Sequence, residues 1–593
     1  MPGFVIDLTD LLEFLSLHRA PMGVARVQMA LLEAGLEPGN PPLFELATFS
    51  PEQGCFVTFA PQLLLDLIRG GREGGPSDAP AWLALNDAAI TLRAAAPAFA
   101  FKAGDRVLAL GLTGSNPNQL RRLRELRQAH GVLICVLFYD AIPLVTPEHC
   151  DLQLSRSFAE HFLAMCLQID RAVAISACSA QDFRSWQRRL LPELDIPVGV
   201  MPLDARFPAL AEAPPVEMPA VLREGRPFVL CVATIEARKN HMLVLHAWLT
   251  LLRRHGDAVI PDLVLLGRPG FQAEPVLRLI AAAPELRRRV THLQDVGDAL
   301  LGQLYEGSLF TIFNSFYEGW GLPVTEALAH GKLALTPDHT SLREAGGSAA
   351  LYFTPQSEPE LAELAWSLIR DPARRQRLEA KIPERVRIRS WREVAEGLIA
   401  TLAVSAPALP EPVARCYFPL GHRIGFDQPV IPDLPELPRA FALLHQLLCE
   451  GEGWSWQERW GIWITAGAAR LRLPLVAPPA DSLALTLELS APPGFPTELR
   501  LRIIPPSALP GPWLTHQFAA SEARHMRIEI ARCEPGDLIV EFDTRHNVPD
   551  HPGGRSLHLF ITGLMLSAAS DREAELRYFS ARAALTPMRG TPA

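Results

Sequence analysis

Short apolar runs rich in Val, Ile and Leu alternate with longer amphipathic stretches from the N-terminus to about residue 400. This alternation is typical of βαβ units, because parallel strands buried on both faces read as continuous apolar runs. The expected strands form two series, one at 3–7, 106–110, 131–138, 171–175 and 197–201, and one from 227 with PFVLCVAT, DLVLLG, VTHL, SLFTIF and KLALT. We therefore predict an α/β protein with two successive doubly wound, Rossmann-like domains.

The rest of the chain has a different pattern. Residues 205–226 carry Pro and charge without periodicity, and residues 406–438 hold eight prolines in 33 positions, too many for helix interiors or central strands. Beyond them, alternating segments such as LALTLEL, LRLRII and LHLFIT predict an antiparallel β-sandwich. The predicted domains are a first Rossmann-like domain at 1–215, a second Rossmann-like domain at 216–405, a Pro-rich linker at 406–438 and an all-β sandwich at 439–593.

Charge and cysteine usage exclude several classes of protein. The 56 Lys and Arg residues against 65 Asp and Glu give a net charge of −9, which supplies no global attraction for nucleic acid. Nine scattered cysteines without a CxxC pair disfavour a disulfide framework or a zinc site. No signal peptide and no run of 18 apolar residues is visible, so we expect a cytoplasmic protein. GxxxxGK[ST] and a GxGxxG after a strand are also absent, which disfavours a P-loop ATPase or a nicotinamide enzyme.

The most informative segment is FTIFNSFYEGWGLPVTEALAHG, residues 310–331. An apolar strand leads into a polar, glycine-rich loop and then into a helix with Pro in its first turn. Gly319 and Gly321 let the backbone approach a ligand, and the amides at the helix N-terminus favour a phosphate. Glu318 and Glu326, eight residues apart, can face the same crevice and accept hydrogen bonds from hydroxyls. The alternative is that Glu326 only complements the helix dipole and Glu318 is solvated.

A second segment, VATIEARKN at 232–240, ends a buried strand in a loop that presents Arg238 and Lys239 just before a helix. This position is the carboxyl edge of the sheet, where open α/β sheets bind ligands. Two cations at that edge can neutralise a diphosphate.

Together these segments resemble the retaining glycosyltransferases of family 4, which have the two-domain GT-B architecture. The resemblance covers about residues 1–405 and also rests on Gly267 after DLVLL and on VGDALLGQLYEGS. MGVARVQMALLEAGL at 22–36 resembles the GI-x-RV loop and first helix of bacterial polysaccharide mannosyltransferases. FYDAIPLVTPE at 138–148 resembles the HD-x-x-P segment of the family, but Tyr139 replaces the histidine and makes any imidazole role doubtful.

The resemblance implies a role for each matching residue. Arg238 and Lys239 bind the donor pyrophosphate, Glu326 binds the ribose, and Glu318 holds hydroxyls of the donor sugar. Asp140 either orients the acceptor hydroxyl or caps a turn, and Arg26 either reaches the cleft or is an ordinary surface arginine. The implied catalytic residues are Arg238, Lys239, Glu318 and Asp140, and the implied donor-binding residues are Gly23, Arg26, Thr234, Gly267, Gly319, Trp320, Gly321, Leu322 and Glu326.

We therefore expect a metal-independent enzyme that moves a hexose or deoxyhexose from a nucleotide sugar to a growing bacterial exopolysaccharide or surface polysaccharide. No DxD motif is present to hold a cation, and the nucleotide sugar is a co-substrate, so no cofactor is expected. GDP-mannose is the first donor, with dTDP-rhamnose or UDP-glucose as alternatives, and the acceptor is an oligosaccharide or a lipid-linked saccharide. The rival interpretations are a non-catalytic carbohydrate-binding or assembly protein on a transferase scaffold, and an epimerase or phosphorylase of the same architecture.

Two further segments suggest surfaces. GWSWQERWGIW at 453–463 concentrates four tryptophans, which either pack the sandwich or, through Trp454 and Trp456, form a platform for sugar rings. The cationic stretch RRLRELRQ at 121–128 is either a solvated helix face or a surface for peripheral contact with lipid headgroups.

Overall fold

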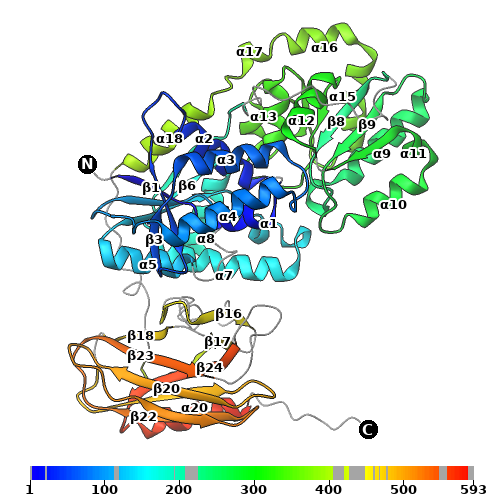
Figure 1. The fold of residues 1–593 in the computed structure, drawn as a ribbon. Coiled ribbons are helices and arrows are strands. Elements are labelled where there is room, and N and C mark those ends of the chain that lie inside the picture. Colours follow the sequence, from blue (N-terminus) through cyan, green and yellow to red (C-terminus); the bar gives the residue numbers. More distant parts are fainter. Residues whose placement is uncertain are drawn as a thin grey trace, which may run out of the picture.

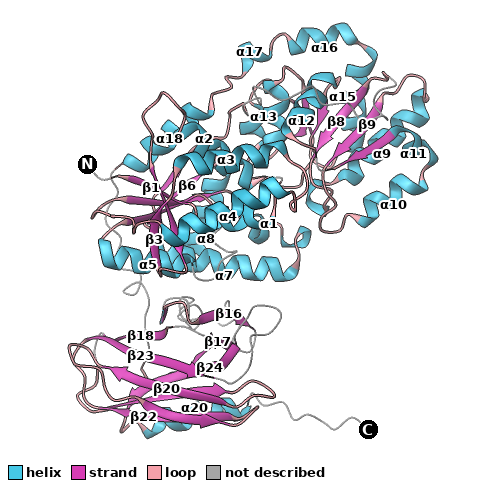
Figure 2. Ribbon diagram, in the orientation of Figure 1, coloured by secondary structure: helices cyan, strands magenta, loops and turns pink. Residues whose placement is uncertain are grey.

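The protein is described by a computed structural model, in which two α/β domains sit beside each other and an all-β domain lies against the first (Figures 1 and 2). The described residues are 3–19, 23–111, 119–192, 194–206, 225–294, 296–404, 420–426, 448–458, 461–465, 468–475, 478–545 and 557–584. The predicted fold class, two Rossmann-like domains in the GT-B arrangement plus a β-sandwich, is confirmed. Most of 205–226 and of the Pro-rich linker lies outside the described residues.

The first domain is built on a sheet with the strand order β3-β2-β1-β4-β5-β6-β7. All neighbouring strands are parallel except β2 and β3, which form an antiparallel hairpin at the edge. Its strands are β1 (Phe4–Asp7), β2 (Glu45–Ser50), β3 (Cys55–Thr58), β4 (Arg106–Ala109), β5 (Leu133–Phe138), β6 (Arg171–Ala174) and β7 (Val198–Val200). Its helices are α1 (Thr9–Leu17), α2 (Val24–Gly35), α3 (Pro61–Glu73), α4 (Pro80–Ala95), α5 (Gln119–His130), α6 (Ile142–Val145), α7 (Leu152–Gln168) and α8 (Ala177–Leu190). All five predicted strands are present, whereas the β2–β3 hairpin was not predicted.

The second domain contains a wholly parallel sheet with the order β10-β9-β8-β11-β12-β13. Its strands are β8 (Phe228–Val232), β9 (Asp262–Leu266), β10 (Val290–Leu293), β11 (Thr311–Ile312), β12 (Ala334–Pro337) and β13 (Leu351–Phe353). Its helices are α9 (His241–His255), α10 (Glu274–Ala282), α11 (Pro284–Arg289), α12 (Asp298–Gly307), α13 (Leu322–Ala329), α14 (Leu342–Gly346), α15 (Glu358–Arg370), α16 (Pro372–Glu379), α17 (Ile382–Arg385) and α18 (Trp391–Ala403). Val229, Leu230 and Val264 are fully buried in the sheet, and burying each such side chain contributes about 1.5–3 kcal/mol.

Helix α18 returns to the first domain after the last strand of the second. It begins with a capping box in which Ser390 and Glu393 bond each other's backbone amides. Arg392 donates to the carbonyl of Ala34 at the end of α2 (3.1 Å), and Arg171 donates to the carbonyl of Thr401 (2.8 Å). The helix therefore ties the two α/β domains together on the side of α2 (Figure 1).

The C-terminal domain is a sandwich of two antiparallel sheets, with orders β16-β17-β24-β19-β22 and β15-β18-β23-β20-β21. Its elements are β14 (Ile424–Gly425), β15 (Cys449–Glu450), β16 (Trp454–Glu458), β17 (Gly461–Thr465), β18 (Ala469–Leu475), β19 (Leu483–Ser490), β20 (Thr497–Ile504), β21 (Leu514–Phe518), β22 (Ala523–Ile530), β23 (Gly536–Arg545), β24 (Leu557–Ala568) and α20 (Arg572–Ala584). In β18 the inward residues Leu471 and Leu473 are buried while Arg470 is exposed, as the period-2 pattern predicts.

The proposed sugar platform is wrong for Trp454. Its side chain is 2% exposed, its ring meets the edge of Phe542, and its Nε1 donates to the carbonyl of Glu450 (2.9 Å). A ring buried between the sheets cannot stack on a sugar. The side chain of Trp456 and all of Trp460 lie outside the described residues.

The cationic stretch 121–128 is neither solvated nor available to lipid. It forms α5, and Arg121, Arg122, Arg124 and Arg127 are all buried. Arg122 forms a bidentate pair with Glu452 of the sandwich (2.8 and 2.7 Å), and Arg124 donates to the carbonyl of Cys449. The arginines thus join the sandwich to the first domain.

None of the helices in the described part of the chain combines the length and the apolar composition that spanning a membrane requires.

Candidate functional site

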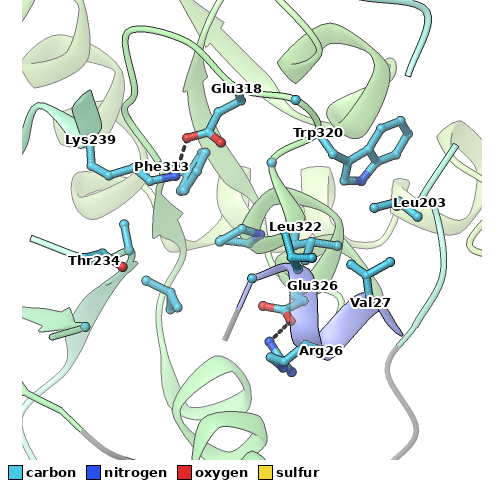
Figure 3. Close-up of a pocket in the computed structure, with 18 of the residues that line it drawn as sticks. Arg26, Val27, Leu203, Thr234, Lys239, Phe313, Glu318, Trp320, Leu322 and Glu326 are labelled. Atoms are coloured by element: carbon cyan, nitrogen blue, oxygen red, sulfur yellow. Dashed lines mark hydrogen bonds and ion pairs between the residues drawn. The ribbon is translucent and has the colours of Figure 1, made fainter. Parts of the chain in front are cut away.

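A cavity of about 440 Å³ lies between the two α/β domains. The second domain contributes the loops that follow β8, β9 and β11, and the first domain contributes the start of α2 and the residues after β5. Figure 3 shows side chains from both domains converging on this space. The cavity therefore lies at the carboxyl edges of two parallel sheets, where the sequence predicted ligand binding.

The loop after β8 positions the two predicted cations. It forms a single 3-10 turn at η4 (Ala237–Lys239) and then reaches Asn240, which adopts a left-handed conformation with φ of 45°. Asn tolerates this conformation better than most residues, and its side chain caps α9 by accepting from the amide of Leu243. The chain thus turns sharply just after Arg238 and Lys239, which leaves both side chains facing the cavity.

Glu318 brings these cations together although it lies some 80 positions further along the chain. Its Oε1 accepts from Nη1 of Arg238 (2.8 Å) and from Nζ of Lys239, as Figure 3 shows for the lysine. Arg238 also donates to the carbonyl of Tyr317 (2.9 Å) and to Oε1 of Glu236 (2.8 Å). The predicted convergence of Arg238, Lys239 and Glu318 on one pocket is therefore present.

The ionisation of this cluster follows from its neighbours. Burial alone would raise the pKa of Glu318, but Arg238 and Lys239 outweigh it and hold the pKa below its ordinary value. The pKa of Lys239 is lowered by burial and by the like charge of Arg238. Burial also opposes the charge of Arg238, yet Glu318 and Glu236 raise its pKa. Glu318 is thus a carboxylate shared by one guanidinium group and one ammonium group.

The glycines of the 310–331 segment allow close approach of backbone. A Cβ on Gly319 would lie 2.5 Å from the carbonyl oxygen of Tyr139 and 3.0 Å from Cβ of Asp140, so the two domains meet at this glycine. Gly321 has φ of 101° and is the N-cap residue of α13. The backbone there is further fixed by Ser341, whose Oγ lies 2.8 Å from the carbonyl of Glu318. Only glycine fits both positions without moving the loop.

Glu326 belongs to a second charged cluster that also crosses between the domains. Its Oε1 accepts from Nη1 of Arg26 (2.7 Å) and its Oε2 accepts from the hydroxyl of Tyr305 (2.7 Å). Nη2 of Arg26 donates to Asp298 (3.2 Å). Arg26 is half-buried, with a side chain 16% exposed and held by two carboxylates, so the interpretation as an ordinary surface arginine is wrong. Burial opposes its charge, but Glu326 and Asp298 raise its pKa.

The remaining predicted residues line the same cavity. Gly23, Thr234, Gly267, Trp320 and Leu322 all lie in its wall. A Cβ on Gly267 would lie 2.0 Å from the carbonyl oxygen of Ala233, which explains glycine after β9. The buried indole of Trp320 donates to Oγ1 of Thr325 (3.0 Å).

Asp140 has the turn-capping role that the sequence allowed. Its Oδ1 accepts from the amide of Ile142 (3.0 Å) and so caps the turn into α6. The residue also lines the cavity. Burial raises its pKa, against the effect of Arg238. Tyr139 is buried and donates to the carbonyl of Leu110 (2.7 Å).

Three functional partners were missed by the sequence reasoning: Glu236, Asp298 and Tyr305. Glu236 stands two residues before Arg238 in the same loop, which was a usable signal. Asp298 and Tyr305 lie on α12, within the segment VGDALLGQLYEGS that the sequence analysis quoted. The segment does not single them out, because their partners Arg26 and Glu326 come from other elements.

Further contacts hold the domains together beside the cavity. The hydroxyl of Tyr317 donates to Asp182 of α8 (2.8 Å). Glu344 accepts from the amides of Ala177 and Cys178 at the N-terminus of α8 (2.7 and 2.9 Å), a position that favours negative charge. Tyr317, the residue before Glu318, and Glu344 therefore both tie the second domain to α8 of the first.

Comparison with known proteins adds independent findings. The family model described as Glycosyl transferases group 1 matches residues 217–385. The chain is 25% identical over 405 residues to the serotype-specific mannosyltransferase WbdA of Escherichia coli, covering 66% of this chain and 44% of WbdA. It is 29% identical over 168 residues to the O-antigen chain mannosyltransferase B of Escherichia coli, covering 28% of this chain and 39% of that protein.

Among solved structures, that of Anabaena Alr3699/HepE in complex with UDP is similar with a TM-score of 0.42 and 16% identity, covering 68% of this chain and all of that chain. The chain spans less than half the length of the curated mannosyltransferases described above.

Proposed function

We propose that the protein is a glycosyltransferase that moves a sugar from a nucleotide sugar to a polysaccharide acceptor. The observation that carries this proposal is the pairing of Arg238 and Lys239 with Glu318 in a cavity between two Rossmann-like domains. The match of residues 217–385 to group 1 glycosyl transferases and the similarity to O-antigen mannosyltransferases support it.

Breaking the bond between sugar and diphosphate places negative charge on the leaving group. Arg238 and Lys239 are fixed before donor arrives, because Glu318, Glu236 and the carbonyl of Tyr317 already hold them. Preorganised charge of this kind stabilises the leaving diphosphate without reorganisation during the reaction. We assign to Glu318 the contact with hydroxyls of the donor sugar and to Glu326 the contact with the ribose.

We infer retention of the anomeric configuration, with the acceptor attacking from the face that the diphosphate leaves. The departing phosphate then takes the proton of the acceptor hydroxyl, so no protein nucleophile is required. We assign the orientation of that hydroxyl to Asp140, which lines the cavity from the first domain.

Mannose is the sugar we propose, from GDP-mannose, because two of the similar proteins are named mannosyltransferases. The acceptor we propose is a bacterial surface polysaccharide, as a free oligosaccharide or on a lipid carrier. dTDP-rhamnose and UDP-glucose are the donors to compare. Eight cysteines in the described part of the chain are free, which suits the reducing cytoplasm where nucleotide sugars are made.

The experiment is a transfer assay with two variants. Arg238→Ala and Glu326→Ala should each lower transfer at least a hundredfold while the circular dichroism spectrum stays that of the wild type. Arg253→Ala, an exposed arginine of the same domain, and Glu363→Ala, an exposed glutamate, are the matched controls. Transfer at the wild-type rate in either site variant overturns the assignment.

A thermal-shift screen separates an enzyme from a carbohydrate-binding scaffold. A nucleotide sugar that binds the native state raises the melting temperature. If GDP-mannose, dTDP-rhamnose and UDP-glucose all leave it unchanged while an oligosaccharide raises it, the scaffold function replaces the one proposed here.

A further inference from the structure

The cavity has a charge balance that does not suit its proposed ligand. Four cationic side chains line it against five acidic ones, so with every group ionised the wall carries one net negative charge. The diphosphate of a nucleotide sugar carries two negative charges. Its entry therefore brings this partly enclosed site to three net negative charges, and protonating one acidic group lowers that to two. The lining groups are Arg26, Arg238, Lys239 and Arg268, and Asp140, Glu236, Asp298, Glu318 and Glu326.

Four of the five acidic side chains already form ion pairs within the protein. Glu318 pairs with Arg238 and Lys239, and Glu236 with Arg238. The other two acids, Glu326 and Asp298, share Arg26. These four gain from staying ionised, because each would lose an ion pair on protonation.

Asp140 differs from the other four acids, because within the described part of the chain it forms no ion pair. Its Oδ1 is used by the amide of Ile142, whereas Oδ2 lies on the side of Gly319, 3.3 Å from where a Cβ on that glycine would stand. Burial raises the pKa of Asp140, and protonating this carboxylate breaks no ion pair. The charged and titratable groups that face it are Arg238, Lys239, Glu318, Asp182 and Cys150.

We propose that Asp140 takes up a proton when a nucleotide sugar enters the cavity, so that donor binding consumes one proton and a neutral carboxyl group faces the diphosphate. In this form the carboxyl group can donate a hydrogen bond to a phosphate oxygen, which the carboxylate cannot do. The inference rests on the proposed function, since it needs a diphosphate ligand, and it adds a proton to the binding equilibrium.

The direction of the pH effect follows from linkage. A proton taken up on binding weakens the complex as pH rises, between the pKa of Asp140 in the free protein and its higher pKa in the complex. Within that window the dissociation constant should rise by up to about tenfold per pH unit. A donor that binds without proton uptake has a dissociation constant independent of pH in the same range.

The test is isothermal titration calorimetry of the full chain with GDP-mannose in PIPES, HEPES and Tris at matched pH. The slope of the observed enthalpy against the ionisation enthalpy of the buffer gives the number of protons taken up. GDP-mannose suits the test because its diphosphate has no group that titrates near neutrality. We expect the uptake to pass through a maximum above about half a proton per donor as the pH is varied.

Asp140→Asn should abolish proton uptake, since the amide mimics the protonated acid and does not titrate. Asp182→Asn is the matched control, because burial raises the pKa of Asp182 too, but this residue is not in the cavity wall and its variant should keep the uptake. The inference is overturned if proton uptake is zero at every pH or if it persists in Asp140→Asn. It is also overturned if donor binding takes up no proton and requires Mg²⁺ instead. If none of GDP-mannose, dTDP-rhamnose and UDP-glucose binds, the proposed function fails instead.

Discussion

Replacing Glu318 by Gln should strengthen the binding of a nucleoside diphosphate while it abolishes transfer. In the protein without donor, Oε1 of Glu318 accepts from both Arg238 and Lys239, so the diphosphate must share these cations with a carboxylate. Gln has nearly the same volume and carries no charge. The variant therefore frees the two cations for the diphosphate and removes a like charge from its surroundings.

The size of this effect can be worked from the geometry. At an effective dielectric constant of about 20, two unit charges about 6 Å apart interact by about 3 kcal/mol. A doubly charged diphosphate at that distance from Glu318 thus meets a repulsion of up to about 5 kcal/mol before water and salt screen it. We expect the measured gain to be a fraction of this, at least about 1.4 kcal/mol or tenfold in the dissociation constant.

The same substitution should lower stability in the absence of ligand. It leaves Arg238 beside Lys239 without the carboxylate between them, and breaking a buried ion pair costs about 3–5 kcal/mol. Arg238 keeps Glu236 and the carbonyl of Tyr317, so we expect the lower end of that range. GDP should then raise the melting temperature more in the variant than in the wild type.

The assay combines calorimetric titration of GDP and UDP with a transfer assay, using Glu363→Gln as an exposed control in the same domain. We expect tighter diphosphate binding together with a kcat reduced at least a hundredfold, because the contact with the donor sugar is lost. Unchanged or weaker diphosphate binding in Glu318→Gln refutes the reasoning that this carboxylate competes for the cations.

Three further outcomes are expected. Tyr305→Phe removes a hydrogen bond to Glu326 worth about 1.5–3 kcal/mol, so the KM for donor should rise with little change in kcat, and an unchanged KM would contradict this orienting role. Glu452→Gln weakens the bidentate pair with Arg122 by about 1 kcal/mol, so amide hydrogen exchange in α5 should be faster in the variant. Equal exchange rates in the variant and the wild type would show that this pair does not stabilise the contact between the sandwich and the first domain. Burial lowers the pKa of His241 to about 4 from 6.5. Because the unfolded chain binds this proton more readily, the free energy of unfolding is highest above about pH 6.5 and falls by up to about 3 kcal/mol as the pH drops towards 4. His241→Leu should therefore reduce the dependence of the free energy of unfolding on pH over that range.

The parts of the fold that the sequence predicted are those set by local pattern. Val229 and Leu230 lie in continuous apolar runs because both faces of their sheet are covered, so the runs could be identified as parallel strands. The β2–β3 hairpin was missed because its strands read ELATFS and CFVT, in which polar residues interrupt the apolar runs that marked the other strands.

The parts that could not be predicted depend on partners distant in sequence. The arginines of α5 have the composition of a solvated face, and only the position of Glu452 and Cys449, more than 300 residues later, makes them buried. Trp454 is similar, since alternating tryptophans do not reveal which face of a strand meets the opposite sheet. For the site, the residue types were predictable but their pairing was not.

That pairing changes what the site must do when it binds. In the protein without donor, Arg238 and Lys239 are neutralised by Glu318 and Glu236, and Arg26 is neutralised by Glu326. An unpaired pair of cations would bind any phosphate, including inorganic phosphate. When carboxylates already neutralise the cations, a ligand binds well only if it forms new bonds to both the cations and the carboxylates that it separates. A nucleotide sugar can do so, because its hydroxyls can bond the carboxylates while its diphosphate takes the cations. The internal ion pairs therefore favour a ligand with both groups at the right separation, and specificity arises from the bonds that binding must break.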